Sequence, residues 1–380
     1  MNIIIACDSF KECLNSSEIA EILAQGLNSV NPDFHITKIP MADGGEGTLE
    51  ALISGNNGKV MSCQAQDPLR RILASKYAVL QDNKTVVIEM AQTCALALVQ
   101  GSERNPWHTT TFGVGQQIKA ALDKGYRDFI IGLGGTSTND GGIGILQCLG
   151  YRFYDKNDKL LDKGRGGKQL LQLQRIDSSL ADQRLKDCHF TLASDVSNPF
   201  YGEKGAAYVY APQKGADREM VILLDQGLRN FSRIISETIN NDISQIPGSG
   251  AAGGTAGGLM AFLNAEIRSG TDIILELFNF SDLIKTCDLV ITGEGKIDEQ
   301  TRFGKVPYRI GKLCQEFKVA VIAICGRLAV EPTALQHWGI DEVYELSPPA
   351  TPLIEAISHC PENLYKTAID IATKLNKTPQ

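Results

Sequence analysis

The chain has 380 residues, of which 43% are hydrophobic and 21% are charged, and its formal net charge is -7 from 37 basic and 44 acidic side chains. At about 100–200 residues per domain the length suggests two or three domains, and the composition excludes a chain that is disordered throughout. Nucleic acid is not an expected partner, because its phosphates need a basic face that a mildly acidic protein lacks. A membrane is not expected either, since no apolar run approaches the roughly 20 residues that cross a bilayer.

The cysteines and histidines argue against a zinc site or a dithiol redox centre. The ten cysteines are scattered without a Cys-x-x-Cys pair, and the five histidines lack metal-ligand spacing. The N-terminus has no basic segment, and Asp8 comes too soon after it for a signal peptide. We therefore expect a cytoplasmic protein with reduced thiols. A homo-oligomer is compatible with the sequence.

The N-terminal residues alternate between strand and helix. Residues 2–6 are apolar and β-branched, which predicts a buried strand, and a helix capped by Asn15 or Ser16 follows. A second strand is predicted at 35–39 and a second helix near 46–54. This order is typical of a parallel, doubly wound sheet.

The middle of the chain has a less regular order. Its predicted strands lie near 75–80, 85–90, 128–132, 189–194 and 206–210, and its predicted helices near 112–124, 218–240 and 256–267.

The C-terminal third returns to the alternation of strand and helix. We predict strands at 288–292, 319–324 and 341–346, and helices near 305–317, 332–338 and 361–375. The fold class is therefore α/β, with one doubly wound domain built from residues 1–57 and 285–380 and a second, mixed-sheet α/β domain inserted at 58–284. In the strand order 2-1-3-4-5, the strands at 2–6 and 288–292 are neighbours, and a crevice opens between their carboxyl ends. The inserted domain would close over this crevice.

Two N-terminal segments carry candidate site residues. Asp8 and Lys11 follow the first strand directly, where Asp8 could hold a metal or a hydroxyl and Lys11 a phosphate or carboxylate. The alternative is a capping Asp and a solvated Lys. Asp43 and Glu46 lie in a glycine-rich helix start that suits a substrate hydroxyl or Mg²⁺, although acids at this position also suit the helix dipole alone.

A glycine-rich loop follows the strand at 128–132. It contains Gly134, Gly135, Thr136, Ser137, Asn139 and Asp140. Ser137 stands where a dinucleotide fingerprint needs its third glycine, and no segment matches the P-loop pattern, so both common nucleotide motifs are missing. A cradle for phosphate remains a reasonable interpretation of so much flexible backbone.

Three later segments complete the candidates. Asp195 follows a predicted strand and could be a general base or a metal ligand, or a turn residue that bonds its own backbone. Lys214 could neutralise a transferring phosphoryl group. The segment from Thr292 to Thr301 suits a metal–phosphate pair, with chance clustering as the rival, and carries Gly293, Glu294, Gly295, Lys296 and Asp298.

Taken in chain order, these segments resemble the glycerate kinase type 1 family. The matching stretches are Asp8-Ser9-Phe10-Lys11, Ala42 to Thr48, Ile88 to Ala91, Arg104-Asn105-Pro106, Thr111 to Gly115, Gly134 to Gly142, Asp195 to Pro199, Pro212 to Ala216, Pro247 to Gly254, and Thr292 to Gly295 with Asp298, Thr301, Gly304 and Lys305. Small departures occur at Cys7, Cys13 and Ser194, where proline, serine and cysteine are common in the family.

The resemblance implies ATP-dependent, Mg²⁺-dependent phosphorylation of D-glycerate, usually to 2-phosphoglycerate, by a flavodoxin-like domain with an inserted domain. Our hypothesis for the catalytic residues is Asp195 as the base, with Asp8 less favoured, and Lys11 as a charge-balancing group. Substrate contacts are assigned to Asp43, Glu46, Asn139, Asp140 and Lys214, and a metal contact to Asp298. Nucleotide contacts are assigned to Gly134, Gly135, Thr136, Ser137, Gly293, Glu294, Gly295 and Lys296.

Three alternatives stay open beside this hypothesis. The first is a kinase of another small hydroxy acid or polyol. The second is a non-catalytic two-domain sensor of a small molecule, which would release no ADP. The third is a nicotinamide-dependent dehydrogenase, which the missing dinucleotide fingerprint disfavours.

Overall fold

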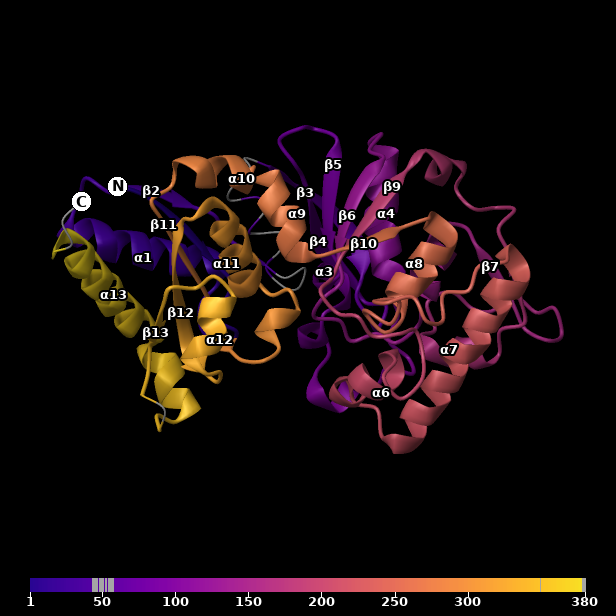
Figure 1. Ribbon diagram of the computed structural model, residues 1–380. Coiled ribbons are helices and arrows are strands. Elements are labelled where there is room, and N and C mark those ends of the chain that lie inside the picture. Colours follow the sequence, from indigo (N-terminus) through magenta and orange to yellow (C-terminus); the bar gives the residue numbers. More distant parts are fainter. Residues whose placement is uncertain (43–46, 48–50, 52, 54–57, 349, 378–380) are drawn as a thin grey trace. The chain divides into compact units, whose positions relative to one another are not determined.

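The computed structural model in Figure 1 describes residues 1–42, 47, 51, 53, 58–348 and 350–377. They form two compact units. The first unit combines the two ends of the chain, and the second takes Gly58–Arg268 together with Gly47. Asp43, Glu46 and most of the helix predicted near 46–54 lie outside the described residues.

The first unit is built on a parallel sheet of five strands in the order β13-β12-β11-β1-β2. The strands are β1 (Asn2–Cys7), β2 (His35–Lys38), β11 (Leu289–Ile297), β12 (Ala320–Leu328) and β13 (Glu342–Glu345). Numbered within the sheet, this is the predicted order 2-1-3-4-5. Because β1 pairs with β11 from Ile3↔Leu289 to Cys7↔Gly293, the residues that follow the two strands are neighbours, as expected.

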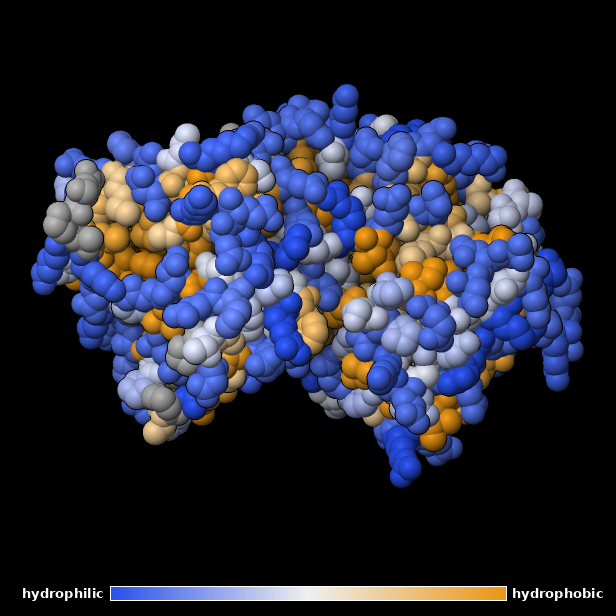
Figure 2. Space-filling view, viewed as in Figure 1, coloured by the Kyte–Doolittle hydropathy of each residue, from blue (hydrophilic) through white to orange (hydrophobic). Residues whose placement is uncertain are grey.

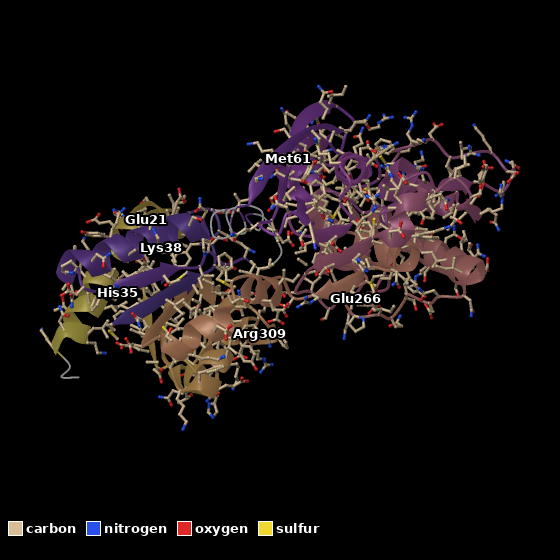
Figure 3. All side chains as sticks on the ribbon, turned by 90° about the horizontal axis from the view of Figure 1, so that it is seen from above. Glu21, His35, Lys38, Met61, Glu266 and Arg309 are labelled. Atoms are coloured by element: carbon tan, nitrogen blue, oxygen red, sulfur yellow. The ribbon has the colours of Figure 1, made fainter. Side chains whose placement is uncertain are left out.

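Helices cover both faces of this sheet (Figure 1). Helix α1 (Ser16–Val30) begins at a capping box between Asn15 and Glu18, and it packs with α13 (Leu353–Lys377) in one core. The Glu21–Lys38 ion pair joins α1 to β2 (Figure 3). Helix α11 (Val306–Phe317) connects β11 to β12 on the other face, and α12 (Pro332–His337) precedes β13.

The last helix begins earlier than predicted. It starts at Leu353 rather than near 361, so Pro361 lies inside it. Proline has no N–H to give to the carbonyl four residues earlier, which here belongs to Ile357. That oxygen instead accepts the thiol of Cys13, with an Sγ–O distance of 3.6 Å. A side chain from another part of the chain therefore partly replaces the bond that proline removes.

The chain returns to the first unit at Ser269, earlier than the predicted boundary between residues 284 and 285. Two short helices that the sequence analysis missed belong to this unit, α9 (Gly270–Leu277) and α10 (Phe280–Leu283). Ser269 caps α9, and Asp272 in its first turn forms an ion pair with Arg309 of α11. These contacts join the two helices to the first unit.

The second unit contains a mixed sheet of six strands in the order β10-β9-β6-β5-β4-β3. Its strands are β3 (Lys59–Gln66), β4 (Ile72–Val79), β5 (Thr85–Glu89), β6 (Asp128–Gly132), β9 (His189–Ala193) and β10 (Glu266–Arg268). The four strands from β10 to β5 are parallel, and β4 and β3 run antiparallel to their neighbours. Met61 and Glu266 mark the two edge strands in Figure 3.

The helices of the second unit lie beside this sheet (Figure 1). They are α3 (Ala91–Cys94), α4 (Phe112–Asp123), α5 (Ile143–Cys148), α6 (Ala206–Tyr210), α7 (Arg218–Ile239) and α8 (Thr255–Leu263). A small antiparallel pair, β7 (Arg152–Tyr154) and β8 (Arg175–Asp177), completes the unit.

One predicted element of this unit is wrong, and another ends earlier than predicted. The strand predicted at 206–210 is helix α6, in which Tyr208 and Val209 are exposed rather than paired in a sheet. The helix predicted at 256–267 ends at Leu263, because Asn264 adopts a left-handed conformation and β10 begins at Glu266.

Each unit has its own hydrophobic core. The first core joins the inner faces of β1, β11 and β12 to α1 and α13, and the second includes the aromatic rings of Phe153, Phe200 and Phe231. Hydrophilic residues cover much of the face drawn in Figure 2, with hydrophobic ones interspersed. All ten cysteines fall within the described residues and carry free thiols. Among those residues, no helix has both the length and the apolar character needed to span a membrane.

Candidate active site

The candidate residues of the second unit follow its parallel strands. Glu89 ends β5, the glycine-rich loop follows β6, and Asp195 comes two residues after β9. Since these strands are parallel neighbours, their carboxyl ends lie at one edge of the sheet, where open α/β sheets bind ligands.

Asp140 anchors the glycine-rich loop to the starts of two helices. Its Oδ2 accepts from the backbone N–H and the hydroxyl of Thr111 at 2.9 and 3.0 Å, just before α4. Its Oδ1 accepts from the N–H of Gly142 at 3.1 Å, just before α5. A carboxylate at two helix N-termini is electrostatically well placed. Burial nevertheless raises the pKa of Asp140, against the lowering effect of these hydrogen bonds.

Lys214 is a buried cation beside the same loop. Its Nζ donates to the carbonyl oxygen of Thr138 at 2.6 Å and to the hydroxyl of Thr136 at 3.3 Å. Burial lowers the pKa of Lys214 to about 8, although the charge of Asp140 acts to raise it. The loop therefore holds an ammonium group that is poorly solvated, and such a group gains from a nearby anion.

The other residues of this loop that we assigned to the nucleotide differ in the hydrogen bonds that they already make within the protein. Ser137 uses both its N–H and its hydroxyl on the carbonyl oxygen of Cys94, at 2.8 and 3.0 Å, so it fixes the loop. The carbonyl oxygen of Gly135 accepts from Leu96 N–H, and Gly135 has a φ of +71°. Gly134 is half-buried at the turn that leaves β6.

Asn139 is fully buried, and its amide finds no hydrogen-bond partner among the residues that the structure describes. The buried hydroxyls of Thr138, in the same loop, and of Ser249, in the loop at 247–254, likewise find no hydrogen-bond partner among the described residues. The two loops touch, because the N–H of Gly141 donates to Gly253 at 3.1 Å and a Cβ on Gly253 would lie 2.2 Å from the Thr138 carbonyl oxygen. Buried polar groups are nearly always paired with protein, water or ligand, so this cluster is suited to hold a polar ligand.

The segment that carries Asp195 lies against the loop at 247–254. Asp195 is half-buried, and a Cβ on Gly248 would lie 3.0 Å from the carbonyl oxygen of the next residue, Val196. Asn198 is structural, since it donates to Lys204 O at 2.8 Å and accepts from the Tyr210 hydroxyl at 2.5 Å. The segment that carries Asp195 is thus fixed at its far end.

Glu89 is a site candidate that the sequence analysis did not select, although its segment was part of the family resemblance. It is buried, and its Oε1 accepts from the N–H of Gly47 at 2.6 Å. Gly47 belongs to the motif of Asp43 and Glu46, which themselves lie outside the described residues. An acid at the end of a buried strand, the pattern that selected Asp195, would also have found Glu89.

In the first unit, the structure brings the Asp8 segment together with the start of the Gly293 segment. The N–H of Asp8 donates to the carbonyl oxygen of Gly293 at 2.8 Å. A Cβ on Gly295 would lie 3.6 Å from the backbone N of Lys11. Asp8 is buried and its Oδ1 accepts from Ser9 N–H at 2.7 Å, whereas Lys11 is exposed.

The segment after Thr292 is strand rather than the predicted loop. β11 continues to Ile297, because β12 extends beside it and pairs Glu294 with Cys325 and Lys296 with Arg327. Glu294 is buried and accepts from the Thr301 hydroxyl and from Lys305 Nζ, the latter at 3.2 Å. Burial raises the pKa of Glu294, and these two donors act in the opposite direction.

Asp298 is the metal candidate of this unit, and it pairs with Lys296 at 3.1 Å. Burial alone would raise the pKa of Asp298, but the hydrogen bonds and charge of Lys296, with the N–H of Gln300, lower it. Within the described ranges no group of three His, Cys, Asp or Glu side chains could hold a metal ion. One carboxylate still fits Mg²⁺, because this ion is usually held by one or two carboxylates together with substrate phosphates.

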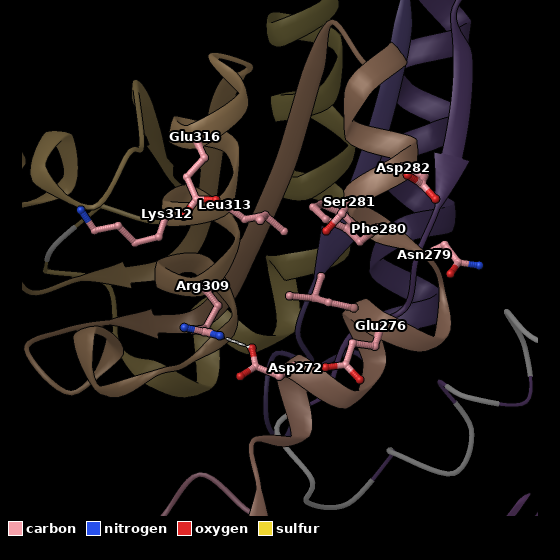
Figure 4. Close-up of a pocket in the computed structure, with 11 residues that line it drawn as sticks. Asp272, Glu276, Asn279, Phe280, Ser281, Asp282, Arg309, Lys312, Leu313 and Glu316 are labelled. Atoms are coloured by element: carbon pink, nitrogen blue, oxygen red, sulfur yellow. Dashed lines mark hydrogen bonds and ion pairs between the residues drawn. The ribbon is translucent and has the colours of Figure 1, made fainter.

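A hollow of about 570 Å³ opens elsewhere in the first unit, between α9, α10 and α11 (Figure 4). Charged and polar side chains dominate its lining, including Asp272, Glu276, Arg309 and Lys312. The Arg309–Asp272 ion pair spans it, as the dashed line in Figure 4 shows. None of the predicted site residues belongs to its lining.

Comparison with known proteins gives consistent matches over the whole chain. The model of the Glycerate kinase family matches residues 3–376. A glycerate kinase of Bacillus subtilis (strain 168) is 42% identical over 100% of this chain and 99% of its own. The glycerate 2-kinase of Escherichia coli (strain K12) is 40% identical, covering 99% and 98% of the two chains. A crystal structure of a candidate glycerate kinase 2 from Salmonella typhimurium LT2 superposes with a TM-score of 0.86 at 38% identity, over 99% of this chain and 98% of that one.

Proposed function

Because this chain belongs to the glycerate kinase family, we propose that it transfers the terminal phosphoryl group of ATP to D-glycerate. We assign the 2-hydroxyl as the acceptor, which gives 2-phosphoglycerate and ADP, and the relative named glycerate 2-kinase supports this choice. The ten free thiols are consistent with our expectation of a cytoplasmic enzyme.

One observation carries the proposal at the level of geometry, namely the buried Lys214, whose Nζ donates to the carbonyl oxygen of Thr138. The next residue in the chain is Asn139, whose buried amide has no hydrogen-bond partner among the described residues. Phosphoryl transfer depends mostly on positioning and on neutralising the charge of the transferring group. The poorly solvated ammonium of Lys214 supplies charge, and the amide of Asn139 supplies a hydrogen-bonding group for positioning. We assign these two side chains, with Asp43 and Glu46, to the acceptor and the transferring phosphoryl group.

Asp195 is our proposal for the base that accepts the proton of the glycerate hydroxyl. Asp140 is less suited, since its two oxygens already accept from Thr111 and Gly142, and we propose that it acts by holding the loop. Glu294 is likewise engaged by Thr301 and Lys305. Asp8 remains the second candidate for the base.

The remaining roles concern the nucleotide and its metal. In the second unit we assign the backbone of Gly134, Gly135 and Thr136 to the phosphates. In the first unit we assign the segment at 293–296 to the nucleotide and Lys11 to balancing charge. Ser137 would act by fixing its loop. Mg²⁺ bound with the nucleotide would neutralise phosphate charge, and Asp298 is the residue that we expect to contact it.

The function is tested by coupled ADP release with D-glycerate and MgATP, with the phosphate position on the product assigned by NMR. We expect ADP release that depends on D-glycerate, and a product phosphorylated at the 2-hydroxyl. A panel of other small hydroxy acids and polyols at fixed ATP separates a kinase with a different acceptor. If no acceptor stimulates ADP release, the chain would instead be a sensor.

The role of Asp195 is tested by Asp195→Asn in the same assay. A general base contributes about 10²–10⁴-fold, so kcat should fall by at least a hundredfold. Asp187→Asn is the matched control, because Asp187 is exposed and precedes the same strand, β9, at its opposite end. A loss of less than about tenfold for Asp195→Asn would remove this residue from the role.

A further inference from the structure

One further glycine cluster of the sequence, at Gly164–Gly167, has no role in the assignments above. The structure packs it closely on the segment before α4. A Cβ on Gly166, whose φ is +78°, would lie 2.6 Å from the carbonyl carbon of His108. The N–H of Lys168 donates to the carbonyl oxygen of Trp107 at 3.2 Å. Glycine is needed here because a side chain would prevent this approach.

A third segment, the turn between β3 and β4, joins the same group. Asp67 holds the turn, since its Oδ1 accepts from the N–H groups of Leu69 and Arg71 at 2.9 and 2.8 Å. Pro68 O accepts from the N–H of Thr110 at 3.1 Å. The turn places Arg70 at a φ of +69°, in the left-handed region that non-glycine residues rarely adopt. The hydrogen bonds of Asp67 and Pro68 hold the backbone of Arg70 in this conformation.

These three segments present a group of basic side chains to solvent: Arg70, His108, Arg165 and Lys168. Arg70 borders the glycine cluster, because a Cβ on Gly164 would lie 3.5 Å from its Cδ. Burial, and then the charges of Lys168, Arg165 and Arg70, lower the pKa of His108, as expected for cations that share one surface. The carboxylate of Asp162 pairs with Arg165 at 3.4 Å, but both side chains are more than half exposed, so this pair is weak.

The basic group borders the glycine-rich loop of the active site. A Cβ on Gly167 would lie 2.5 Å from the carbonyl oxygen of Asn139. The hydroxyl of Thr109, next to His108, donates to the carbonyl oxygen of Ser137 at 2.8 Å. Asn139 is therefore a residue of the glycine-rich loop that contacts the basic segment through its carbonyl oxygen, and its buried amide has no hydrogen-bond partner in the described part of the chain.

We infer that Arg70, His108, Arg165 and Lys168 form the surface that binds the polyphosphate chain of the nucleotide. This inference rests on the proposed function and adds the side chains that would recognise the donor substrate. Several cations around one surface suit a ligand with several negative charges, whereas the single carboxylate of glycerate needs only one or two of them. The planar guanidinium groups of Arg70 and Arg165 also match phosphate oxygens in a bidentate way.

The test compares single substitutions in the full-length protein. The variants are Arg70→Gln, Arg165→Gln and Lys168→Gln, with Lys156→Gln as the control because Lys156 is an exposed lysine in another turn of the same unit. Binding of inorganic tripolyphosphate is measured by calorimetry, and KM is measured separately for MgATP and D-glycerate. Each basic variant should weaken tripolyphosphate binding and raise the KM for MgATP by about tenfold, as expected for losing one charge-assisted hydrogen bond. The KM for D-glycerate should change less than about twofold, and the control should match the wild type.

The outcomes separate the inference from the function on which it rests. If the KM for D-glycerate rises instead, the surface binds the acceptor and the inference is overturned. It is also overturned if the wild type does not bind tripolyphosphate, or if all three variants bind it as the wild type does. If tripolyphosphate binding falls in the variants while the wild type does not phosphorylate D-glycerate, the basic surface stands and the proposed acceptor is wrong. Circular dichroism of each variant confirms that a loss of binding is not a loss of folding.

Discussion

At the scale of single residues, Lys214 is unusual because it carries an ammonium group into the interior of the second unit. Burial costs a charged lysine more than a neutral one, and this lowers the pKa of Lys214 from 10.5 to about 8. The cost is offset by bonds to Thr136 and Thr138 and by the charge of Asp140. The protein therefore keeps a destabilising cation where the proposed reaction needs one.

This pKa shift predicts how stability depends on pH. Below pH 8 both the folded and the unfolded chain hold the proton of Lys214, and the full cost of the buried charge applies. Between about pH 8 and 10.5 the unfolded chain holds more of this proton than the folded one, so the free energy of unfolding rises with pH. The rise that Lys214 contributes from pH 7.5 to 10 is about 2 kcal/mol.

The measurement is urea unfolding of the wild type and of Lys214→Met across this pH range. The difference in the free energy of unfolding between the two proteins should move by about 2 kcal/mol in favour of the wild type as the pH rises. Lys156→Met, at an exposed lysine, should run parallel to the wild type. Parallel curves for Lys214→Met would show that Lys214 does not titrate differently in the folded state.

The acidic candidates show what the sequence could and could not predict at this scale. Asp195 was selected because an acid follows a buried strand, Asp140 because it lies in the glycine-rich loop, and Glu294 because it lies in a predicted strand-to-helix loop. In the structure Asp195 comes two residues after β9, Asp140 lies in the loop that follows β6, and Glu294 lies within β11. Their surroundings differ: Asp140 meets two helix N-termini and Glu294 meets Thr301 and Lys305. Those partners lie from two to about thirty residues away along the chain, so local patterns identify the acids but not the hydrogen bonds that they make.

At the scale of elements, local sequence patterns predicted which helices and strands exist better than they predicted where each one ends. The strand order of the first unit followed from the alternation of strand and helix, and the structure confirms it. β11 runs past Gly293 and Gly295 only because β12 extends beside it, and that pairing joins residues about thirty positions apart. In α6, a short β-branched and aromatic segment forms one helical turn after Gly205, and its local sequence also suits a strand.

Helix α13 offers a test of an element that continues through proline. Pro361→Ala restores the N–H that can donate to Ile357 O, and interior proline costs a helix about 3 kcal/mol. The gain should be smaller, about 1–2 kcal/mol, because that oxygen already accepts from the Cys13 thiol. Urea unfolding measures the change.

Pro307→Ala is the control for this substitution. Pro307 lies in the first turn of α11, where its missing N–H has no intrahelical partner, so its replacement should leave stability unchanged or lower it through lost packing. Equal gains at Pro361 and Pro307 would contradict the explanation, since only the interior position frees a carbonyl.

At the scale of the whole molecule, the chain divides into two units with separate cores, and each contains one of the two tryptophans. Trp107 belongs to the second unit, and Trp338 is buried in the first. A discontinuous unit and an inserted one were predicted from the order of elements alone. The point where the chain returns to the first unit could not be predicted, because α9 and α10 join that unit through contacts with α11 that no local pattern reveals.

The tryptophans allow each unit to be followed by itself in the intact chain. In Trp107→Phe the fluorescence reports the first unit, and in Trp338→Phe it reports the second. Because the units have separate cores, we expect different urea midpoints in the two variants.

Tripolyphosphate should raise the urea midpoint reported by Trp107 more than the midpoint reported by Trp338, because a ligand stabilises the unit that binds it. Trp107 lies in the unit of the basic surface, and its carbonyl oxygen accepts a hydrogen bond from the N–H of Lys168. Coincident curves that shift together would show instead that the two units unfold as one cooperative body, and a shift confined to Trp338 would place the polyphosphate on the first unit.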